Sequence, residues 1–201
     1  MSADADNRNI LTLAALAFTG GLGGGVVFPI LPLLGLRLGI PAALIGLILS
    51  INRIARLAVN PLTGIVVDRF GARWPLILGM LIEAVSTLCF YVGAHAAHAA
   101  AWFLGGRVLW GVGSSLLMIG VLAAALVFAP ETGAGLATAK VRMSLSLGMP
   151  AGLVLGGLVA AQASPGAAFL AAAAITFGGA LYAWRFAPHG TRPAHALGRV
   201  R

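Results

Sequence analysis

The sequence predicts an all-α integral membrane protein with six transmembrane helices. Hydrophobic residues make up 60% of the 201 residues and charged residues only 9%, with a mean hydropathy of +0.99. A soluble domain normally carries about a quarter charged residues. The chain also contains six apolar runs of the length, roughly 20 residues, that a helix needs to cross a hydrocarbon core of about 30 Å. We therefore expect the lipid bilayer to be its solvent.

The six predicted helices cover residues 10–34, 41–67, 75–93, 99–128, 140–160 and 167–186. The first contains a cluster of glycines followed by Pro29 and Pro32, so we expect it to bend or break. Residues 1–9 form a polar leader, and the first run is too long for the apolar region of a secretory signal. Residues 10–187 are predicted to form the bundle, and the basic segment 188–201, rich in Pro and Gly, a flexible cytoplasmic tail.

Basic residues are distributed unevenly between the two sides of this bundle. The outer loops contain only Arg37, whereas the inner segments contain Arg8, Arg69, Arg73, Lys140, Arg142, Arg185, Arg192, Arg199 and Arg201. Cytoplasmic segments of membrane proteins carry the excess of Lys and Arg. Both termini are therefore predicted to be cytoplasmic, in the plasma (inner) membrane. This orientation accounts for most of the net charge of +8 without a nucleic-acid partner.

A charged loop joins the second and third runs, with Gly64, Asp68, Arg69, Gly71 and Arg73 in the order G-x-x-x-D-R-x-G-A-R. We expect the glycines to let the helix ends turn sharply, and Asp68 to cap the next helix or pair with Arg73. The pattern resembles the loop signature of the major facilitator superfamily, G-x-x-x-D-R-x-G-R-[RK], with Ala in place of one basic residue. The resemblance implies a membrane transporter whose loop latches its two halves together. A purely topogenic basic turn is the alternative.

The fourth run carries a second motif that is similar to the family's R-x-x-x-G-x-G, formed by Arg107, Gly111 and Gly113. Arg107 lies about 12 Å from the outer helix end at 1.5 Å per residue. An Arg at such depth costs at least about 2.5 kcal/mol, so it normally turns toward a cavity or a partner; snorkelling to the outer interface is the alternative. In the family this Arg is implicated in proton transfer. The two glycines are predicted to allow close helix packing.

The fifth run presents Gly148, Gly152, Gly156 and Gly157 as a smooth face for packing against another helix. This pattern resembles the motif that marks proton antiporters within the family. That motif has a Pro directly after its second Gly, where this chain has Leu153. The departure weakens the inference of antiport.

Polar residues of the second run form a stripe, because Asn52, Arg56 and Asn60 recur at four-residue spacing with Arg53 beside them. Arg53 lies about 18 Å into the helix, near the bilayer midplane, where a charge marks a functional site by default. We interpret these four residues as substrate or cavity candidates. A structural hydrogen-bond ladder to an adjacent helix is the alternative.

Glu83 is the one carboxylate within the apolar runs, and it is the candidate proton carrier together with Arg107. Its proton affinity depends on its burial and on a nearby Arg53 or Arg107, and this competition can couple a proton to a substrate. A structural pairing of Glu83 is the alternative. The intramembrane Arg residues exceed Glu83 by two charges, so we expect either an anionic substrate or acidic residues from another subunit.

Transporters of the family have about twelve helices in two halves, each made of two inverted three-helix repeats. The six runs correspond to the first half, and alternating access needs two bundles that rock about a midplane site. The sequence thus predicts a half-size secondary active transporter subunit that moves a small solute together with a second six-helix half, and the resemblance implies that transport is coupled to protons. A separately encoded heterodimer partner is favoured over a homodimer. The alternatives are a non-transporting structural or regulatory subunit and a drug/proton antiporter subunit.

An enzyme is not expected. Ser114 follows Gly113, but an intramembrane serine protease needs a different Gly–Ser spacing and a His on a late helix. A water channel of the Asn-Pro-Ala type fails because Asn60-Pro61 is followed by Leu62. No metal-ligand cluster, nucleotide motif or cofactor-binding motif is present, so neither a cofactor nor a metal is predicted.

Overall fold

The computed structural model describes residues 3–129 and 133–188, and almost all of them are helical. The six helices are α1 (Ala3–Arg37), α2 (Ala42–Phe70), α3 (Arg73–Gly93), α4 (Ala99–Phe128), α5 (Ala134–Gln162) and α6 (Pro165–Phe186). Each is long and apolar enough to cross a membrane. The predicted fold class, an all-α membrane bundle, is confirmed.

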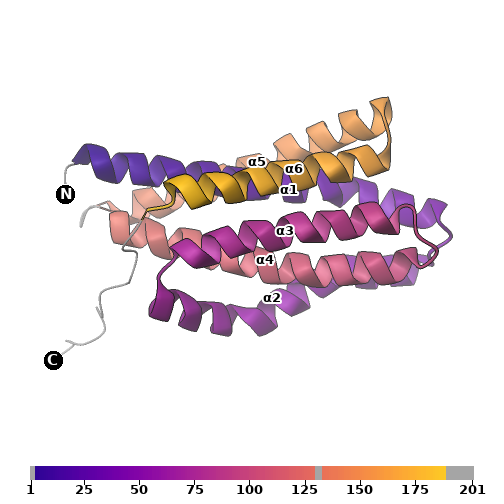
Figure 1. Ribbon diagram of the computed structural model, residues 1–201, viewed down its shortest axis with the longest axis horizontal. Coiled ribbons are helices and arrows are strands. Elements are labelled where there is room, and N and C mark those ends of the chain that lie inside the picture. Colours follow the sequence, from indigo (N-terminus) through magenta and orange to yellow (C-terminus); the bar gives the residue numbers. More distant parts are fainter. Residues whose placement is uncertain (1–2, 130–132, 189–201) are drawn as a thin grey trace.

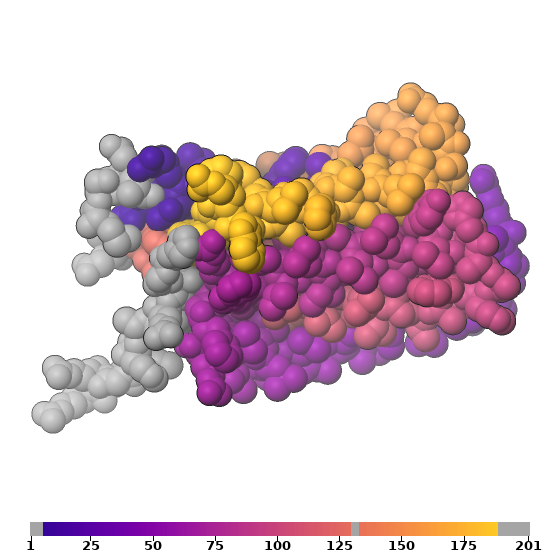
Figure 2. Space-filling model, viewed as in Figure 1, coloured from indigo at the N-terminus to yellow at the C-terminus, as the bar shows by residue number. Residues whose placement is uncertain are grey.

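The helices run back and forth along one axis, so that α1 begins and α6 ends at the same end of the bundle (Figure 1). The main contacts join the first three helices to the last three: α1 packs on α5 and α6, α2 on α4, and α3 on α4 and α6. Suppose that α1, α2 and α3 are exchanged, in this order, with α4, α5 and α6. The contact between α1 and α5 then corresponds to the contact between α4 and α2, and the contact between α3 and α4 corresponds to that between α6 and α1. This symmetry is that of two three-helix repeats. Figure 2 shows α3 and α6 side by side on one face.

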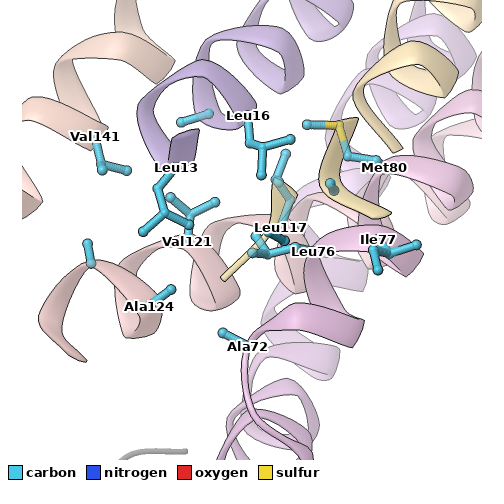
Figure 3. Packing of buried hydrophobic residues seen from close by; sticks show 14 of the residues in the cluster. Leu13, Leu16, Ala72, Leu76, Ile77, Met80, Leu117, Val121, Ala124 and Val141 are labelled. Carbon is cyan, nitrogen blue, oxygen red and sulfur yellow. The ribbon is translucent and has the colours of Figure 1, made fainter. Parts of the chain in front are cut away.

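Two apolar clusters fill the bundle, one toward each end. The first draws on all six helices and includes Leu13, Leu76, Met80, Leu117 and Val121 (Figure 3). The second surrounds the aromatic rings of Phe90, Phe103 and Phe169, which pack edge to face or tilted with centroids 5.8 to 6.4 Å apart. The chain positions between the two clusters carry the glycines of α1, Glu83 of α3 and the serines of α4. The bundle therefore has a polar layer at mid-height.

The helix ends differ from those predicted because backbone hydrogen bonding continues beyond the apolar runs. The leader is not a separate segment, since α1 begins at Ala3. α1 does not break, because the helix continues through Pro29 and Pro32, so of the two expected outcomes only a bend is compatible with it. α5 begins at Ala134, six residues before the predicted start, which places Lys140 and Arg142 in its second and third turns and not in its first. The predicted tail, apart from Pro188, lies outside the described residues.

The charged loop is also shorter than predicted. α2 extends to Phe70, so Gly64 lies inside the helix with no atom close to it, and only Gly71, with a φ of +80°, supports the turn. Asp68 neither caps α3 nor pairs with Arg73 in the part of the chain that the structure describes. Arg73 instead donates a 2.6 Å hydrogen bond to the carbonyl oxygen of Trp184, and the Trp74 and Trp184 rings meet edge to face. This contact joins the loop to the end of α6.

Candidate functional site

A cavity of about 270 Å³ lies in the polar layer between α1, α2, α4 and α5. Glycines of α1 leave one wall without side chains, and the Trp110 ring lies against this wall: a Cβ on Gly24 would fall 3.0 Å from the ring. Most of the lining is apolar. Its charged and hydroxyl side chains are those of Arg56, Glu83, Ser114, Arg142 and Ser146.

Glu83 reaches the cavity from α3, which packs on α4 and α6. It fits there because α1 and α4 carry glycines opposite it: a Cβ on Gly20 would lie 3.6 Å from its Oε2 atom, and a Cβ on Gly113 only 2.9 Å from its Cγ atom. The side chain is 1% exposed, and Oε2 has no hydrogen-bond partner among the described residues. A buried polar atom without a partner is costly, so it indicates a ligand or proton that the site is built to accept.

Arg56 of α2 and Arg142 of α5 also line this cavity. Arg56 is half-buried and Arg142 is exposed. Guanidinium groups present five N–H donors in a planar fork that matches carboxylate, sulfonate and phosphate groups. The cavity therefore combines two fixed positive charges with one ionisable carboxyl group.

The predicted stripe on α2 is divided between different environments. Asn60 accepts a 2.7 Å hydrogen bond from Ser115 of α4, and the Ser115 hydroxyl oxygen lies 2.9 Å from that of Thr63. Because Ser115 donates its only proton to Asn60, Thr63 must be the donor in the second bond. Asn52 is half-buried, and its Oδ1 atom has no partner in the described ranges. Asn60 thus belongs to a hydrogen-bond ladder, whereas Arg56 faces the cavity.

Arg107 is buried but does not line this cavity. Its Nη2 atom donates a long, 3.4 Å hydrogen bond to the carbonyl oxygen of Leu49, and its Nε atom has no partner among the described residues. Arg53 is exposed and close enough to Arg107 for the two charges to repel each other. Neither Arg53 nor Arg107 lines the cavity with Glu83, whereas Arg56 and Arg142 do.

Glycines set the close approaches between helices. A Cβ on Gly111 would fall 2.5 Å from the carbonyl oxygen of Asn52, so α4 and α2 touch at this point. Gly148, Gly152 and Gly156 lie against the α1 backbone in the same way. Gly157, which we predicted to share this packing face, instead points into open space.

Sequence reasoning missed Arg142, Trp110 and Ser146 as cavity residues. Arg142 was assigned to the cytoplasmic side because it lies in the first turn of the predicted helix, which started at Lys140. The early start of α5 carries Arg142 inward by about two turns, since each turn adds 5.4 Å. The signal that could have found it is the continuation of helix-forming residues back to Ala134.

A sequence profile described as Major Facilitator Superfamily matches residues 13–199. The chain belongs to this superfamily. The geometry above agrees with that membership, because six apolar helices form two three-helix repeats around a central cavity. The chain is thus a multi-pass membrane protein of a transporter family.

Three relatives within the superfamily illustrate what the chain is similar to. It is 31% identical over 113 residues to "Multidrug resistance protein 2" of Bacillus subtilis (strain 168), covering 56% of this chain and 27% of that protein. It is 27% identical over 109 residues to the "Bacillibactin exporter" of the same strain, covering 54% and 27%. It is 28% identical over 115 residues to "Quinolone resistance protein NorA" of Staphylococcus aureus (strain Mu50 / ATCC 700699), covering 57% and 29%. The matches span little more than a quarter of each relative's length.

Proposed function

We propose that the chain is one half of a proton-coupled secondary transporter that moves a small anionic solute across the plasma membrane by alternating access. One observation carries the proposal: Arg56, Arg142 and Glu83 line a single cavity whose walls are otherwise mainly apolar. Charged groups are expensive inside a membrane and normally mark the path of a substrate or ion. Two positive charges against one carboxyl group favour an anion.

A second six-helix half is part of this proposal, because alternating access requires two bundles around the binding site. The faces of α2 and α5 support it. In the most apolar windows of these helices only 11% and 17% of residues are buried, against 50 to 61% in the other four helices. α2 and α5 also contribute Arg56 and Arg142, so a second bundle on these faces would close the cavity. A separately encoded partner that supplies acidic residues fits the excess of Arg better than a second copy of this chain.

Transport of matched probes by the reconstituted complex tests the proposal. Benzenesulfonate is a permanent anion, and trimethylphenylammonium carries a permanent positive charge on the same ring. We expect proteoliposomes to accumulate benzenesulfonate when a proton gradient is applied, and Arg56→Gln to abolish the uptake. Uptake of the cation instead would favour a drug/proton antiporter, the reading that the names of the relatives suggest.

Native mass spectrometry of the complex, purified through a tag on this chain, tests the assembly. An additional mass of similar size would identify the second half, and twice the chain mass would indicate a homodimer. A bare monomer that transports neither probe would contradict the proposal and favour a non-transporting structural or regulatory subunit.

A further inference from the structure

Basic and aromatic side chains meet where α3 begins and α6 ends, in a patch formed by Arg73, Trp74, Trp184 and Arg185. We propose that this α3–α6 patch binds one anionic phospholipid. Arg73 and Arg185 contact the headgroup, and the acyl chains lie along the exposed apolar residues of the two helices. The patch is on the outside of the bundle, so the inference goes beyond the proposed function and does not depend on the cavity.

The guanidinium group of Arg73 is held in place between the two helices. Its Nη2 atom donates a 2.6 Å hydrogen bond to the carbonyl oxygen of Trp184, and among the described residues this is the one hydrogen bond of the Arg73 side chain. A guanidinium group has five N–H donors, in a planar fork that matches a phosphate group. The remaining donors are therefore available to a phosphate, and little side-chain freedom is left to lose when it binds.

Arg185 adds a second positive charge to the patch, because it directly follows Trp184. Its side chain is exposed and lies over the ring of Phe186, with 5.3 Å between the guanidinium carbon and the ring centroid. Neither Arg73 nor Arg185 forms an ion pair with a carboxylate of the described residues. Two basic residues without an acidic partner favour a ligand that carries negative charge.

The length of α3 places the patch at the level of lipid headgroups. α3 has 21 residues, and at 1.5 Å per residue it spans about 32 Å, close to the hydrocarbon thickness of about 30 Å. Arg73 and Trp74 are its first two residues, so they lie at the boundary of the hydrocarbon. Trp74 and Trp184 are both exposed, and their rings meet edge to face with centroids 5.8 Å apart. Exposed Trp rings are typical of this boundary.

The surface next to the patch is apolar, which favours a lipid over a soluble anion. α3 and α6 lie side by side (Figure 2), and both expose large apolar side chains. These are Leu78, Val85 and Leu88 of α3, and Phe177 and Leu181 of α6. Beyond the patch, the two helices contain one charged residue, Glu83, which is buried. A phosphate ion would leave the apolar surface uncovered, whereas a phospholipid covers it and also supplies the negative charge.

Photocrosslinking with two matched lipids tests the inference. The complex, purified through a tag on this chain, is placed in phosphatidylcholine nanodiscs with a small fraction of a probe lipid that carries a diazirine near the start of its acyl chains. The probe is either phosphatidylglycerol, which is anionic, or phosphatidylcholine with the same chains, which is zwitterionic. We expect more phosphatidylglycerol adducts on residues 73–81 and 177–186, by about fivefold for each arginine that contacts the headgroup. Mass spectrometry of the peptides measures the adducts.

Variants assign this preference to the patch. Arg185→Gln removes one charge and keeps the hydrogen bond from Arg73 to the Trp184 carbonyl group, so it should lower the yield of phosphatidylglycerol adducts about fivefold. Arg73→Gln should lower the yield as well, and it also removes the bond between the helices. Arg37→Gln is the matched control, because Arg37 is exposed in the last turn of α1, at the opposite end of the bundle (Figure 1). It should retain the wild-type yield on α3 and α6.

Each contrary outcome has a definite meaning. Equal yields from the two probes would overturn the inference, because α3 and α6 would then be an ordinary lipid-facing surface. Unchanged phosphatidylglycerol yields in Arg185→Gln and Arg73→Gln would overturn the role of the arginines. Absence of adducts from both probes would overturn the inference by showing that protein covers this face. All three outcomes leave anion transport in place, which the benzenesulfonate assay tests separately.

Discussion

Ser115 and Glu83 are buried polar side chains of the same layer that differ in their hydrogen bonding. The Ser115 hydroxyl group is completely buried and makes hydrogen bonds of 2.7 Å to Asn60 and 2.9 Å to Thr63. Glu83 is equally buried, yet one of its oxygens has no partner in the described part of the chain. A satisfied group stabilises the bundle, whereas an unsatisfied one is retained for a purpose other than stability. This contrast separates structural residues from candidates for transport.

The hydrogen bonds of Ser115 lead to a prediction about stability. Ser115→Ala should lower the free energy of unfolding by on the order of 1 kcal/mol, because it leaves Asn60 and Thr63 without their partner in a buried site. Ser50→Ala is the control, since Ser50 is exposed and bonds only to a carbonyl of its own helix. Thermal unfolding in nanodiscs measures both. Equal losses in the two variants would contradict the structural role of the α2–α4 ladder.

At the scale of the helix, sequence reasoning predicted the existence of all six elements but not their ends. A run of about 20 apolar residues is sufficient to predict a membrane helix, because each unsatisfied backbone group is costly in hydrocarbon. Helices also continue into polar residues at the membrane surface, and hydropathy does not report this continuation. The leader and the first turns of α5 were missed for that reason, and Arg142 was missed with them.

Side-chain partners were harder to predict than helices. The spacing of Asn52, Arg56 and Asn60 correctly indicates one side of a helix, but that side meets both α4 and the cavity, and spacing alone does not say which residue faces which. The direction of Gly157 was misjudged for a related reason. Adjacent glycines point about 100° apart on a helix of 3.6 residues per turn, so only one of Gly156 and Gly157 can face α1.

This pair of glycines provides a prediction about the contact between α1 and α5. Gly152→Ala should destabilise the bundle by about 1 to 3 kcal/mol, because its Cβ would overlap the carbonyl oxygen of Leu22, which belongs to the backbone and cannot move aside easily. Gly157→Ala should be neutral or slightly stabilising, because the position is open and Ala is the better helix former. Unfolding in nanodiscs compares them. A destabilising Gly157→Ala would show that the assembled protein covers this face.

At the scale of the whole molecule, the six helices differ in how much of their apolar surface is buried. In their most apolar windows α1, α3, α4 and α6 are 50 to 61% buried, whereas α2 and α5 are only 11% and 17% buried and leave large apolar side chains exposed, such as Leu57 at 72% and Val154 at 64%. α2 also carries Arg53 and Arg56 near its middle, and α5 carries Arg142 in its third turn. Charge is poorly compatible with lipid. Polar and apolar exposure on the same faces is typical of a surface that another protein covers, because lipid would satisfy only the apolar part.

Site-specific photocrosslinking distinguishes protein from lipid on these faces. A benzophenone amino acid placed at Leu57 of α2 or Val154 of α5 should form adducts with the second six-helix half. At Leu88 of α3 or Leu181 of α6, which are also exposed, the same probe should react mainly with lipid. Mass spectrometry of the adducts identifies the partner directly. Protein adducts from α3 and α6 with none from α2 and α5 would place the partner on the opposite side of the bundle, where it could not close the cavity over Arg56 and Glu83.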